Sequence, residues 1–237
     1  MKIEVCVDNY KSIDNSLGLK IDRLEICSAL ALDGLTPSMG LVKYAKEKSQ
    51  SEIHVMIRPN NGNFIYSENE KKIMLSDVEE FLKYKIDGIV IGALTVENKV
   101  DPLFLEPFVK IAKENNIQIT FHRAIDLVEE YLNEIKILIN LGFDRILTSG
   151  HLRSVYSGIT KIQEINNIYG SEIDIMAGGG IRKDNIKQLV STGINNIHLS
   201  ASVVDKLNQK NCLFQDNSSM NKVFSIKKFQ SIAKQLM

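Results

Sequence analysis

The chain opens on the stretch Lys-Ile-Glu-Val-Cys-Val-Asp, residues 2–8, and this stretch sets the pattern from which the fold is predicted. Apolar side chains at its odd-numbered positions alternate with polar or small side chains at its even-numbered positions. Successive side chains of a β-strand point to opposite faces, so the alternation predicts a strand with one apolar and one polar face. The stretch Arg-Leu-Glu-Ile-Cys at residues 23–27 repeats the pattern.

Six further strand-like stretches follow along the chain, separated by amphipathic helical patterns. The predicted strands beyond the first two are residues 53–58, 88–94, 118–123, 145–149, 173–178 and 196–201, and the predicted helices are residues 41–48, 71–84, 103–115, 127–141, 154–169, 183–192 and 225–236. Strands that alternate with helices predict a parallel sheet with right-handed crossovers. We therefore expect one α/β domain over residues 1–237, a single (β/α)8 barrel of the TIM type. An open doubly wound sheet is the alternative, and no Gly-x-Gly-x-x-Gly follows the first strand.

Local signals agree with these boundaries. Ser67 and Glu70 have the spacing of a capping box before a helix. Asp101 precedes a proline at a predicted first helical position. Gly142 and Gly193 follow predicted helices, where a left-handed C-cap is expected.

Composition excludes several classes of protein. The 29 acidic and 29 basic residues balance, so no broad basic surface for nucleic acid is expected. No apolar run approaches the ~18 residues that a membrane span requires, and no signal peptide is recognised. Three cysteines are too few and uneven for a disulfide framework, which favours a reducing cytoplasmic location. The polar stretch at residues 205–222 is expected to be a surface loop or a lid over the barrel mouth.

The predicted strands carry ionisable side chains on the face that must point into the barrel. They are Glu4, Cys6, Asp8, Glu25, Cys27, His54, Arg58, His122 and His198. Buried charges must be paired, so one interpretation is an internal salt-bridge network with Arg58 against Glu4 or Glu25. The other is a polar pocket with shifted pKa values, in which Glu4, Glu25, Arg58 and His122 would be the catalytic residues of an enzyme.

Cys6 and Cys27 are the first candidate site. Both face inward on adjacent predicted strands, about 4.8 Å apart. Thiolates select Cu(I) or zinc, so the pair predicts a site for one soft metal ion. The alternative is two small buried core residues. Cys212 lies in the polar stretch and is either a third ligand or an incidental thiol.

Two further candidate sites lie at predicted strand ends. Glycines 178–180 after the seventh strand, with Ser200 after the eighth, predict an anion site, because glycine lets backbone N–H groups approach a phosphate; the alternative is a tight turn. That set is Gly178, Gly179, Gly180 and Ser200. In the fifth strand, His122 is a candidate general acid or base, and Arg123 and Asp126 would orient a ligand or pair with each other. A three-histidine metal site from His54, His122 and His198 is not expected, because they lie at different depths.

Several segments together resemble the CutC family. They are Glu-Val-Cys-Val-Asp at residues 4–8, residues 22–30, Gly-Leu-Thr-Pro-Ser at 34–38, His-Val-Met-Ile-Arg-Pro at 54–59, Thr-Phe-His-Arg-Ala at 120–124, residues 145–150 and Gly-Gly-Gly-Ile at 178–181. The resemblance implies a cytosolic (β/α)8 barrel, often oligomeric and linked to copper homeostasis, with the two inward cysteines as the natural Cu(I) ligands. Ala177 stands where the family commonly has proline.

Two functions remain open at this point. The first is a copper homeostasis protein that binds Cu(I) through Cys6 and Cys27, as a possible homo-oligomer without nucleic-acid or membrane partners. The second is an enzyme that acts on a small anionic substrate, such as a phosphate or a sugar derivative, held by the glycine loop.

Overall fold

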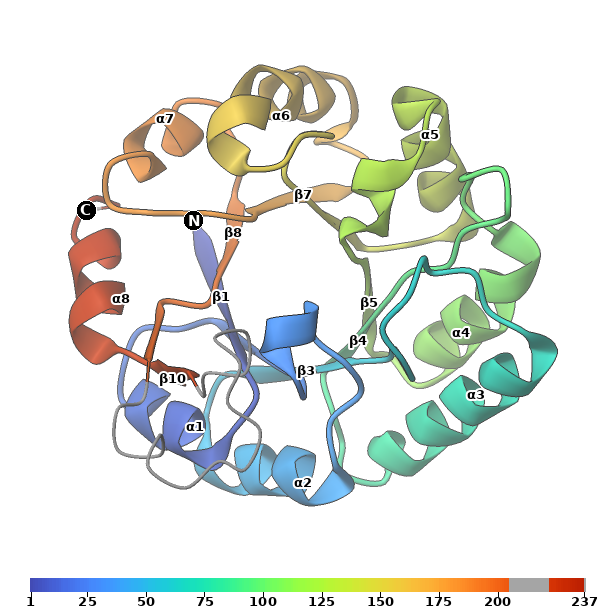
Figure 1. Cartoon of the computed structure of the whole chain (residues 1–237), viewed down its shortest axis with the longest axis horizontal. Helices are drawn as coiled ribbons and strands as arrows, with labels where there is room; N and C mark the ends of the chain where they lie inside the picture. Colours follow the sequence, from blue (N-terminus) through green and yellow to red (C-terminus); the bar gives the residue numbers. More distant parts are fainter. Residues whose placement is uncertain (205–221, 237) are drawn as a thin grey trace.

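Eight parallel strands close into a barrel in the computed structural model, which describes residues 1–204 and 222–236 (Figure 1). The strands are β1 Lys2–Val7, β2 Arg23–Ile26, β3 Glu52–Met56, β4 Gly88–Ile91, β5 Gln118–Phe121, β6 Arg145–Thr148, β7 Asp174–Gly178 and β8 Asn196–Leu199. β1 pairs in parallel with both β2 and β8, which closes the ring. The predicted (β/α)8 barrel is therefore confirmed, and the open doubly wound sheet is wrong.

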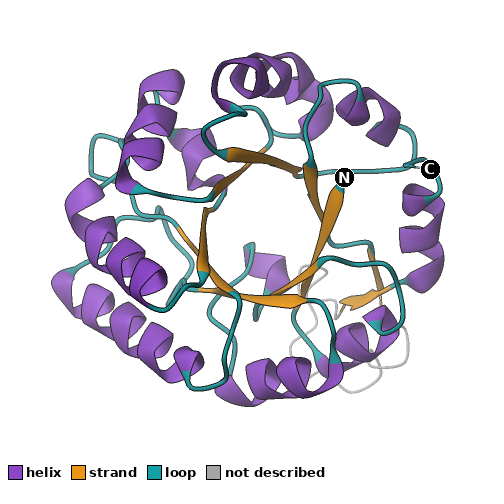
Figure 2. Ribbon diagram, turned by 180° about the vertical axis from the view of Figure 1, so that it is seen from behind, coloured by secondary structure: helices purple, strands orange, loops and turns teal. Residues whose placement is uncertain are grey.

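Helices surround the ring of strands on its outside (Figure 2). The α-helices are α1 Tyr10–Ser16, α2 Met39–Lys48, α3 Glu68–Leu82, α4 Pro102–Glu114, α5 Tyr131–Leu141, α6 Val155–Tyr169, α7 Ile186–Val190 and α8 Ile226–Ala233. Two 3-10 helices, η1 Leu30–Leu32 and η2 Arg123–Leu127, follow β2 and β5. A short antiparallel hairpin of β9 Ser202–Val204 and β10 Lys222–Phe224 follows β8.

The main hydrophobic core lies between the outer face of the barrel and the helices. Val5, Leu24, Ile53, Ile119 and Ile197 point outward from five strands and are fully buried in this layer. Each such side chain stabilises the fold by about 1.5–3 kcal/mol relative to an exposed one. The apolar face of the alternating strands therefore anchors the helices, and the polar face is left for the interior.

Three of the four predicted helix-end signals are confirmed, whereas Gly193 has a φ of 81° but lies two residues beyond Ser191, the C-cap of α7. The Ser67 side chain accepts a hydrogen bond from the Glu70 N–H, and the Glu70 carboxylate accepts one from the Ser67 N–H, which completes the capping box. Asp101 caps α4 through the Phe104 N–H. Gly142 ends α5 at a φ of 96°, in the left-handed region that favours glycine.

Three helices differ from the prediction. Helix α1 was not predicted, because Ile13 is its only buried apolar residue. The Asn9 side chain caps it, and the Ser12 hydroxyl accepts a hydrogen bond from the Phe224 N–H of β10, so distant contacts hold it in place. Helix α5 begins at residue 131 rather than 127 because residues 123–127 form η2. Helix α7 is shorter than predicted, since the Asn185 side chain bonds to the backbone of the preceding turn.

The polar stretch predicted as a loop or lid lies almost wholly outside the described residues. Only Lys222 of that stretch is described, and it begins β10. The Lys222 carbonyl accepts a hydrogen bond from the Asn9 side chain, which ties the hairpin to the start of α1. Among the helices of the described residues, none is long and apolar enough to cross a membrane.

Candidate functional site

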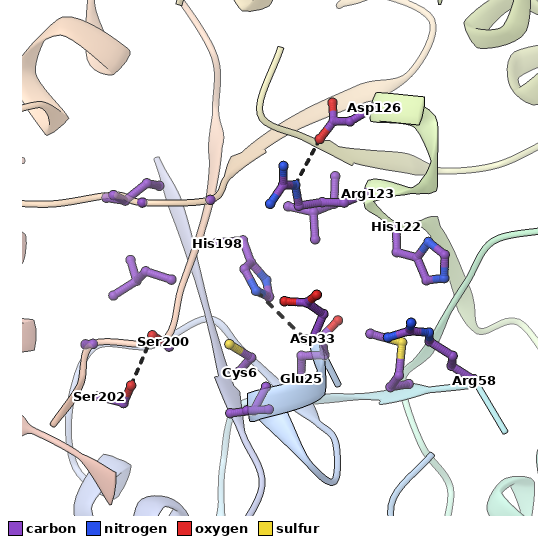
Figure 3. A pocket seen from close by; sticks show the side chains of 18 of the residues that line it. Cys6, Glu25, Asp33, Arg58, His122, Arg123, Asp126, His198, Ser200 and Ser202 are labelled. Carbon is purple, nitrogen blue, oxygen red and sulfur yellow. Dashed lines mark hydrogen bonds and ion pairs between the residues drawn. The ribbon is translucent and has the colours of Figure 1, made fainter. Parts of the chain in front are cut away.

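A pocket of about 650 Å³ opens at the carboxyl ends of the barrel strands, where the active sites of TIM barrels lie (Figure 3). Of the predicted site residues, those that line it are Cys6, Glu25, Arg58, His122, Arg123, Asp126, Gly179, Gly180 and Ser200. His198, which the sequence placed in the interior, lines it as well. Glu4, Cys27 and Gly178 are not part of its lining.

Cys6, Glu25 and His198 form the floor of the pocket, where they lie close together (Figure 3). They come from β1, β2 and β8, which are neighbours because the barrel closes. One donor atom from each of the three lies within 4.8 Å of the others. The Nε2 atom of His198 is 3.8 Å from the Oε2 atom of Glu25. Glu25 is 2% exposed, and its Oε1 atom has no hydrogen-bond partner among the described residues.

A buried ion-pair network supports His198 from below. The Nδ1 atom of His198 lies 2.7 Å from Oε1 of Glu4, and Nε of Arg23 donates to Oε2 of Glu4 at 3.0 Å. Arg23 also donates to the Asn196 side chain at 2.9 Å. Glu4 and Arg23 are fully buried. The partner of Glu4 is thus Arg23, and the predicted pairing of Arg58 with Glu4 or Glu25 is wrong.

Burial and close partners shift the pKa values of this group in different directions. Burial raises the pKa of Glu4, but the hydrogen bond from His198 and the positive charges of His198 and Arg23 outweigh it and leave the pKa well below its usual range. Burial lowers the pKa of His198, but Cys6, Glu25 and Glu4 raise it well above the usual value. Burial raises the pKa of Glu25. Glu4 and His198 are therefore an ion pair, and Glu25 ionises less readily than an exposed glutamate.

Cys6 and Cys27 belong to a small cluster that is separate from the main core. Its buried members are Cys6, Cys27, Met56 and Val90. The Cys27 thiol donates to Oε2 of Glu25 at 3.3 Å. A Cβ placed at Gly34 would lie 3.5 Å from Sγ of Cys27 and 3.6 Å from Cε of Met56, so the two sulfur-bearing side chains flank the same point. Burial raises the pKa of both thiols, and the charge of Glu25 adds to this effect.

Arg58 and His122 form the wall opposite the floor (Figure 3). Arg58 donates to the backbone carbonyls of Leu32 and Gly34, at 2.9 and 3.1 Å, and its guanidinium lies over the Phe64 ring. This explains why Arg58 does not pair with a carboxylate. The Nδ1 atom of His122 accepts a hydrogen bond from the Ala124 N–H. Burial and the charge of Arg58 lower the pKa of His122 to about 3. His122 is therefore neutral, with its proton on Nε2, which has no partner among the described residues.

The rim of the pocket is built around Asp126. Arg123 pairs with Asp126 at 2.9 Å and donates to the Ser149 hydroxyl at 2.7 Å. Asp126 also accepts hydrogen bonds from the backbone N–H groups of Ser149 and His151. A Cβ at Gly179 would lie 3.1 Å from Nη1 of Arg123, and Gly179 has a φ of 99°. Glycine therefore lets the backbone approach the Arg123 guanidinium at this rim.

The remaining predicted residues lie away from the pocket lining. His54 is fully buried deeper in the barrel, and burial lowers its pKa to about 3. Asp8 accepts a hydrogen bond from the Leu30 N–H and so fixes η1. Gly178 pairs with His198 between β7 and β8. The one group of His, Cys, Asp and Glu donors that the described residues bring together is the floor, so the three histidines share no site. Cys212 lies outside the described residues.

Arg23 and Met56 are the residues that sequence reasoning missed. Arg23 shares the inward face of β2 with Glu25, and Met56 shares that of β3 with His54. The alternation of both strands already placed the two side chains on the inward face. Neither stood out as a site residue, because Arg23 is the first residue of its predicted strand and Met56 is apolar. Arg23 bonds to Glu4 of β1 and Asn196 of β8, and Met56 packs in one cluster with Cys6 of β1 and with Cys27 just after β2, so only the barrel register reveals their roles.

Comparisons with known proteins agree with this geometry. A model of the CutC family matches residues 1–203. A family protein CutC of Glaesserella parasuis serovar 5 is 41% identical over 202 residues, which cover 85% of this chain and 82% of that protein. A family protein CutC of Aliivibrio fischeri is 38% identical over 201 residues, with 84% and 81% covered.

Two solved structures are similar to this chain to different degrees. The crystal structure of a copper homeostasis protein CutC from Streptococcus agalactiae is similar, with a TM-score of 0.79 and 31% identity over 84% of this chain and 98% of that chain. Phosphoribosyl anthranilate isomerase from Thermococcus kodakaraensis has a TM-score of 0.60 at 11% identity, which shows the fold alone. The chain therefore belongs to the CutC family.

Proposed function

We propose that this chain binds Cu(I) as its cargo through Cys6 and Cys27, with the thioether of Met56 as a third soft ligand. The observation that carries the proposal is the cluster in which these three side chains pack together beside the pocket floor. Thiolates and thioethers are the ligands that select Cu(I) over hard cations. The similar protein from Streptococcus agalactiae is named a copper homeostasis protein, which supports the choice of metal.

The surroundings of the cluster set the conditions for binding. Both thiols are buried and have raised pKa values, so Cu(I) must displace their protons. We therefore expect Cu(I) affinity to rise with pH. Cys6 and Met56 line the pocket, which offers the ion a route from solvent.

An anaerobic Cu(I) titration against a chromophoric chelator tests the proposal. The wild-type chain is expected to bind one Cu(I). Cys6→Ser and Cys27→Ser should each weaken binding by about 100-fold or more, roughly 2.7 kcal/mol. Met56→Leu, which keeps the volume and removes the sulfur, should weaken it by a smaller factor. Cys212→Ser is the matched control and should bind like the parent. Parent-like affinity in both Cys6→Ser and Cys27→Ser would rule out the site.

A second function is supported by the charge of the pocket. Five basic residues line it, and three acidic ones; the basic set is Arg58, Arg123, Arg182, Lys222 and Lys228. A small anion entering from solvent would meet this rim first, beside Gly179, Gly180 and Ser200. An enzyme acting on a small anionic substrate is the corresponding proposal, with Glu25 and His122 as candidate acid and base and Arg58 as an orienting group. Glu4, which is outside the lining, would position His198.

Calorimetry with inorganic phosphate tests the anion site. Phosphate should bind the wild-type chain, and Arg123→Met should weaken it about 10-fold, because one charged hydrogen-bond donor contributes roughly 1.4 kcal/mol. Lys110→Met, a basic residue exposed on α4, is the control and should have no effect. Equal affinities in all three proteins would reject the anion site.

That the chain forms a homo-oligomer in the cytosol stays a prediction.

A further inference from the structure

We propose that Cys6, Glu25 and His198 form a second ligand set that binds a divalent transition metal ion, with zinc as its best representative, and leaves one coordination position open to the pocket. The proposal does not rest on Cu(I) binding, although the two sites share Cys6. A sulfur, a nitrogen and an oxygen donor make a mixed set, which suits zinc better than Cu(I).

The geometry of His198 prepares it as a ligand. Its Nδ1 atom is held by Glu4 at 2.7 Å, which leaves Nε2 to face the pocket floor. Nε2 is 3.8 Å from Oε2 of Glu25, and the donor atoms of all three residues lie within 4.8 Å of one another. Zinc bonds of about 2.0–2.3 Å in a tetrahedral site place ligand atoms roughly 3.3–3.8 Å apart. Small side-chain rotations therefore bring the three donors into bonding range.

Glu25 supplies an independent observation. It is 2% exposed, and its Oε1 atom lacks a hydrogen-bond partner in the described part of the chain. A buried carboxyl oxygen without a partner is unfavourable, and proteins rarely keep one without a reason. A metal ion on the floor would satisfy it, and the Cys27 thiol already orients the other oxygen.

Glu4 and Arg23 act behind the ligands. A carboxylate on the far nitrogen of a ligating histidine fixes its tautomer and orientation, and Glu4 has this relation to His198. Arg23 donates to Glu4, and the Asn196 side chain in turn accepts a hydrogen bond from Arg23. The floor therefore has the supporting network of a metal site, in which Glu4 is a positioning residue.

The open position determines what the ion would do. Three protein ligands with a fourth position facing a cavity are typical of catalytic rather than structural zinc sites. The pocket lies over the floor, with the neutral His122 and the cationic Arg58 opposite. The ligand class that fits is a small anionic molecule with an oxygen donor, which would replace a water on the ion while its negative groups face the basic rim.

Zinc titration of the full-length chain against a chromophoric chelator tests the proposal. One zinc per chain is expected. Glu25→Gln and His198→Gln should weaken zinc binding by about 100-fold while Cu(I) affinity stays within a few-fold of the parent. Cys27→Ser should weaken Cu(I) binding while zinc affinity stays within a few-fold of the parent. Cys6→Ser should weaken the binding of both ions. His54→Gln, which changes a buried barrel histidine outside the pocket lining, is the matched control and should keep both.

Loss of zinc binding in His54→Gln or Cys27→Ser to the same degree as in Glu25→Gln would overturn the site. So would parent-like zinc affinity in Glu25→Gln and His198→Gln. If these variants fail to fold, Co(II) added to the wild-type chain gives an independent measurement. A thiolate-to-metal charge-transfer band with tetrahedral d–d bands supports the assignment, and octahedral Co(II) without thiolate contradicts it. These outcomes are separate from the Cu(I) titration, because Glu25 and His198 are not in the Cu(I) set.

Discussion

The barrel interior has two halves that are both polar but differ in how their charged groups are used. In the half towards the amino ends of the strands, Glu4 and Arg23 pair with each other, and Arg145 donates to Thr120 and to Gln118. These charged groups are nearly or wholly buried, and although Nη1 of Arg23 and Nε of Arg145 lack partners among the described residues, neither arginine lines the pocket. We call this the closed half.

The open half is the pocket at the carboxyl ends. Here Oε1 of Glu25 and Nε2 of His122 have no partners in the described residues, and both side chains line the cavity. His198 joins the two halves, with Nδ1 on Glu4 and Nε2 towards Glu25. The comparison teaches that a buried ionisable group is structural where the strand register supplies its partner. It is a candidate ligand or catalyst where the register leaves a donor atom facing a cavity.

The largest expected effect comes from breaking the closed half. Glu4→Leu leaves Arg23 and His198 charged and buried without their carboxylate, so the free energy of unfolding should fall by about 3–5 kcal/mol. Glu25→Gln in the open half removes a carboxyl whose cationic neighbour, Nε2 of His198, is 3.8 Å away and already paired with Glu4 through Nδ1, so it should change the free energy of unfolding by less than about 1 kcal/mol. Urea unfolding of both variants measures the contrast. Equal losses would show that the two carboxyl groups do not differ in role.

Gly88, which begins β4, and Gly92, which directly follows it, give the next contrast, because each leaves room for a histidine ring. A Cβ at Gly88 would lie 2.5 Å from the His54 ring, and one at Gly92 would lie 2.4 Å from the His122 ring. Both alanine variants should be destabilised, by about 1–3 kcal/mol. Gly88→Ala should cost more, because His54 is fully enclosed whereas His122 can move into the pocket. A larger loss for Gly92→Ala, measured by urea unfolding, would contradict this.

Acidic pH should weaken the fold through His54 and His122. Both have a folded pKa of about 3, below the ordinary value of 6.5, so the unfolded chain binds more protons as pH falls below 6.5. The free energy of unfolding should therefore decrease from pH 6 to 5, by up to about 1.4 kcal/mol per pH unit for each histidine. The contribution of His198 to the pH dependence has the opposite sign. Its raised pKa adds stability at low pH, and this stability is lost as pH rises through the pKa of the folded chain.

Unfolding free energies at pH 6 and pH 5 test this dependence. His54→Gln should flatten it, and so should His122→Gln, whereas the parent slope in both variants would show that the two rings are already protonated in the folded chain. The window lies above the ordinary carboxyl range, so the lowered pKa of Glu4 contributes only at more acidic pH.

The smallest effect is expected behind the rim of the open half. The Tyr131 hydroxyl lies 2.6 Å from Oγ1 of Thr148, which donates to Asp126. Tyr131→Phe removes one buried hydrogen bond and should lower the free energy of unfolding by about 1 kcal/mol. Chemical denaturation is again the measurement, and a loss above about 3 kcal/mol would show that the rim is a structural centre like the closed half.

The fold could be predicted because alternation and helical periodicity are local properties of the sequence. The apolar face of β1 predicted the outer layer, and the same alternation placed Cys6 and Glu25 inside. Helix α1 could not be predicted, since its stability depends on Asn9 and on β10, more than 200 residues away.

The site could be predicted only in part, because its groupings depend on the barrel register. Cys6 stands opposite Glu25 across β1 and β2, while Glu4 stands opposite His198 across β1 and β8. Sequence spacing gives no information on the second pairing, since it joins the first strand to the last. The sequence therefore identified the cysteines and inward-facing His198 separately, and only the closed ring joined Cys6 to His198 and to Glu25.

The most direct test of the open half as a metal-binding site is anomalous scattering at the zinc absorption edge from a crystal soaked in zinc. The account predicts one strong peak on the pocket floor, within bonding distance of Sγ of Cys6, Nε2 of His198 and a carboxyl oxygen of Glu25. Zinc found only on surface side chains, with the floor unoccupied at a concentration that saturates the protein in solution, would contradict it.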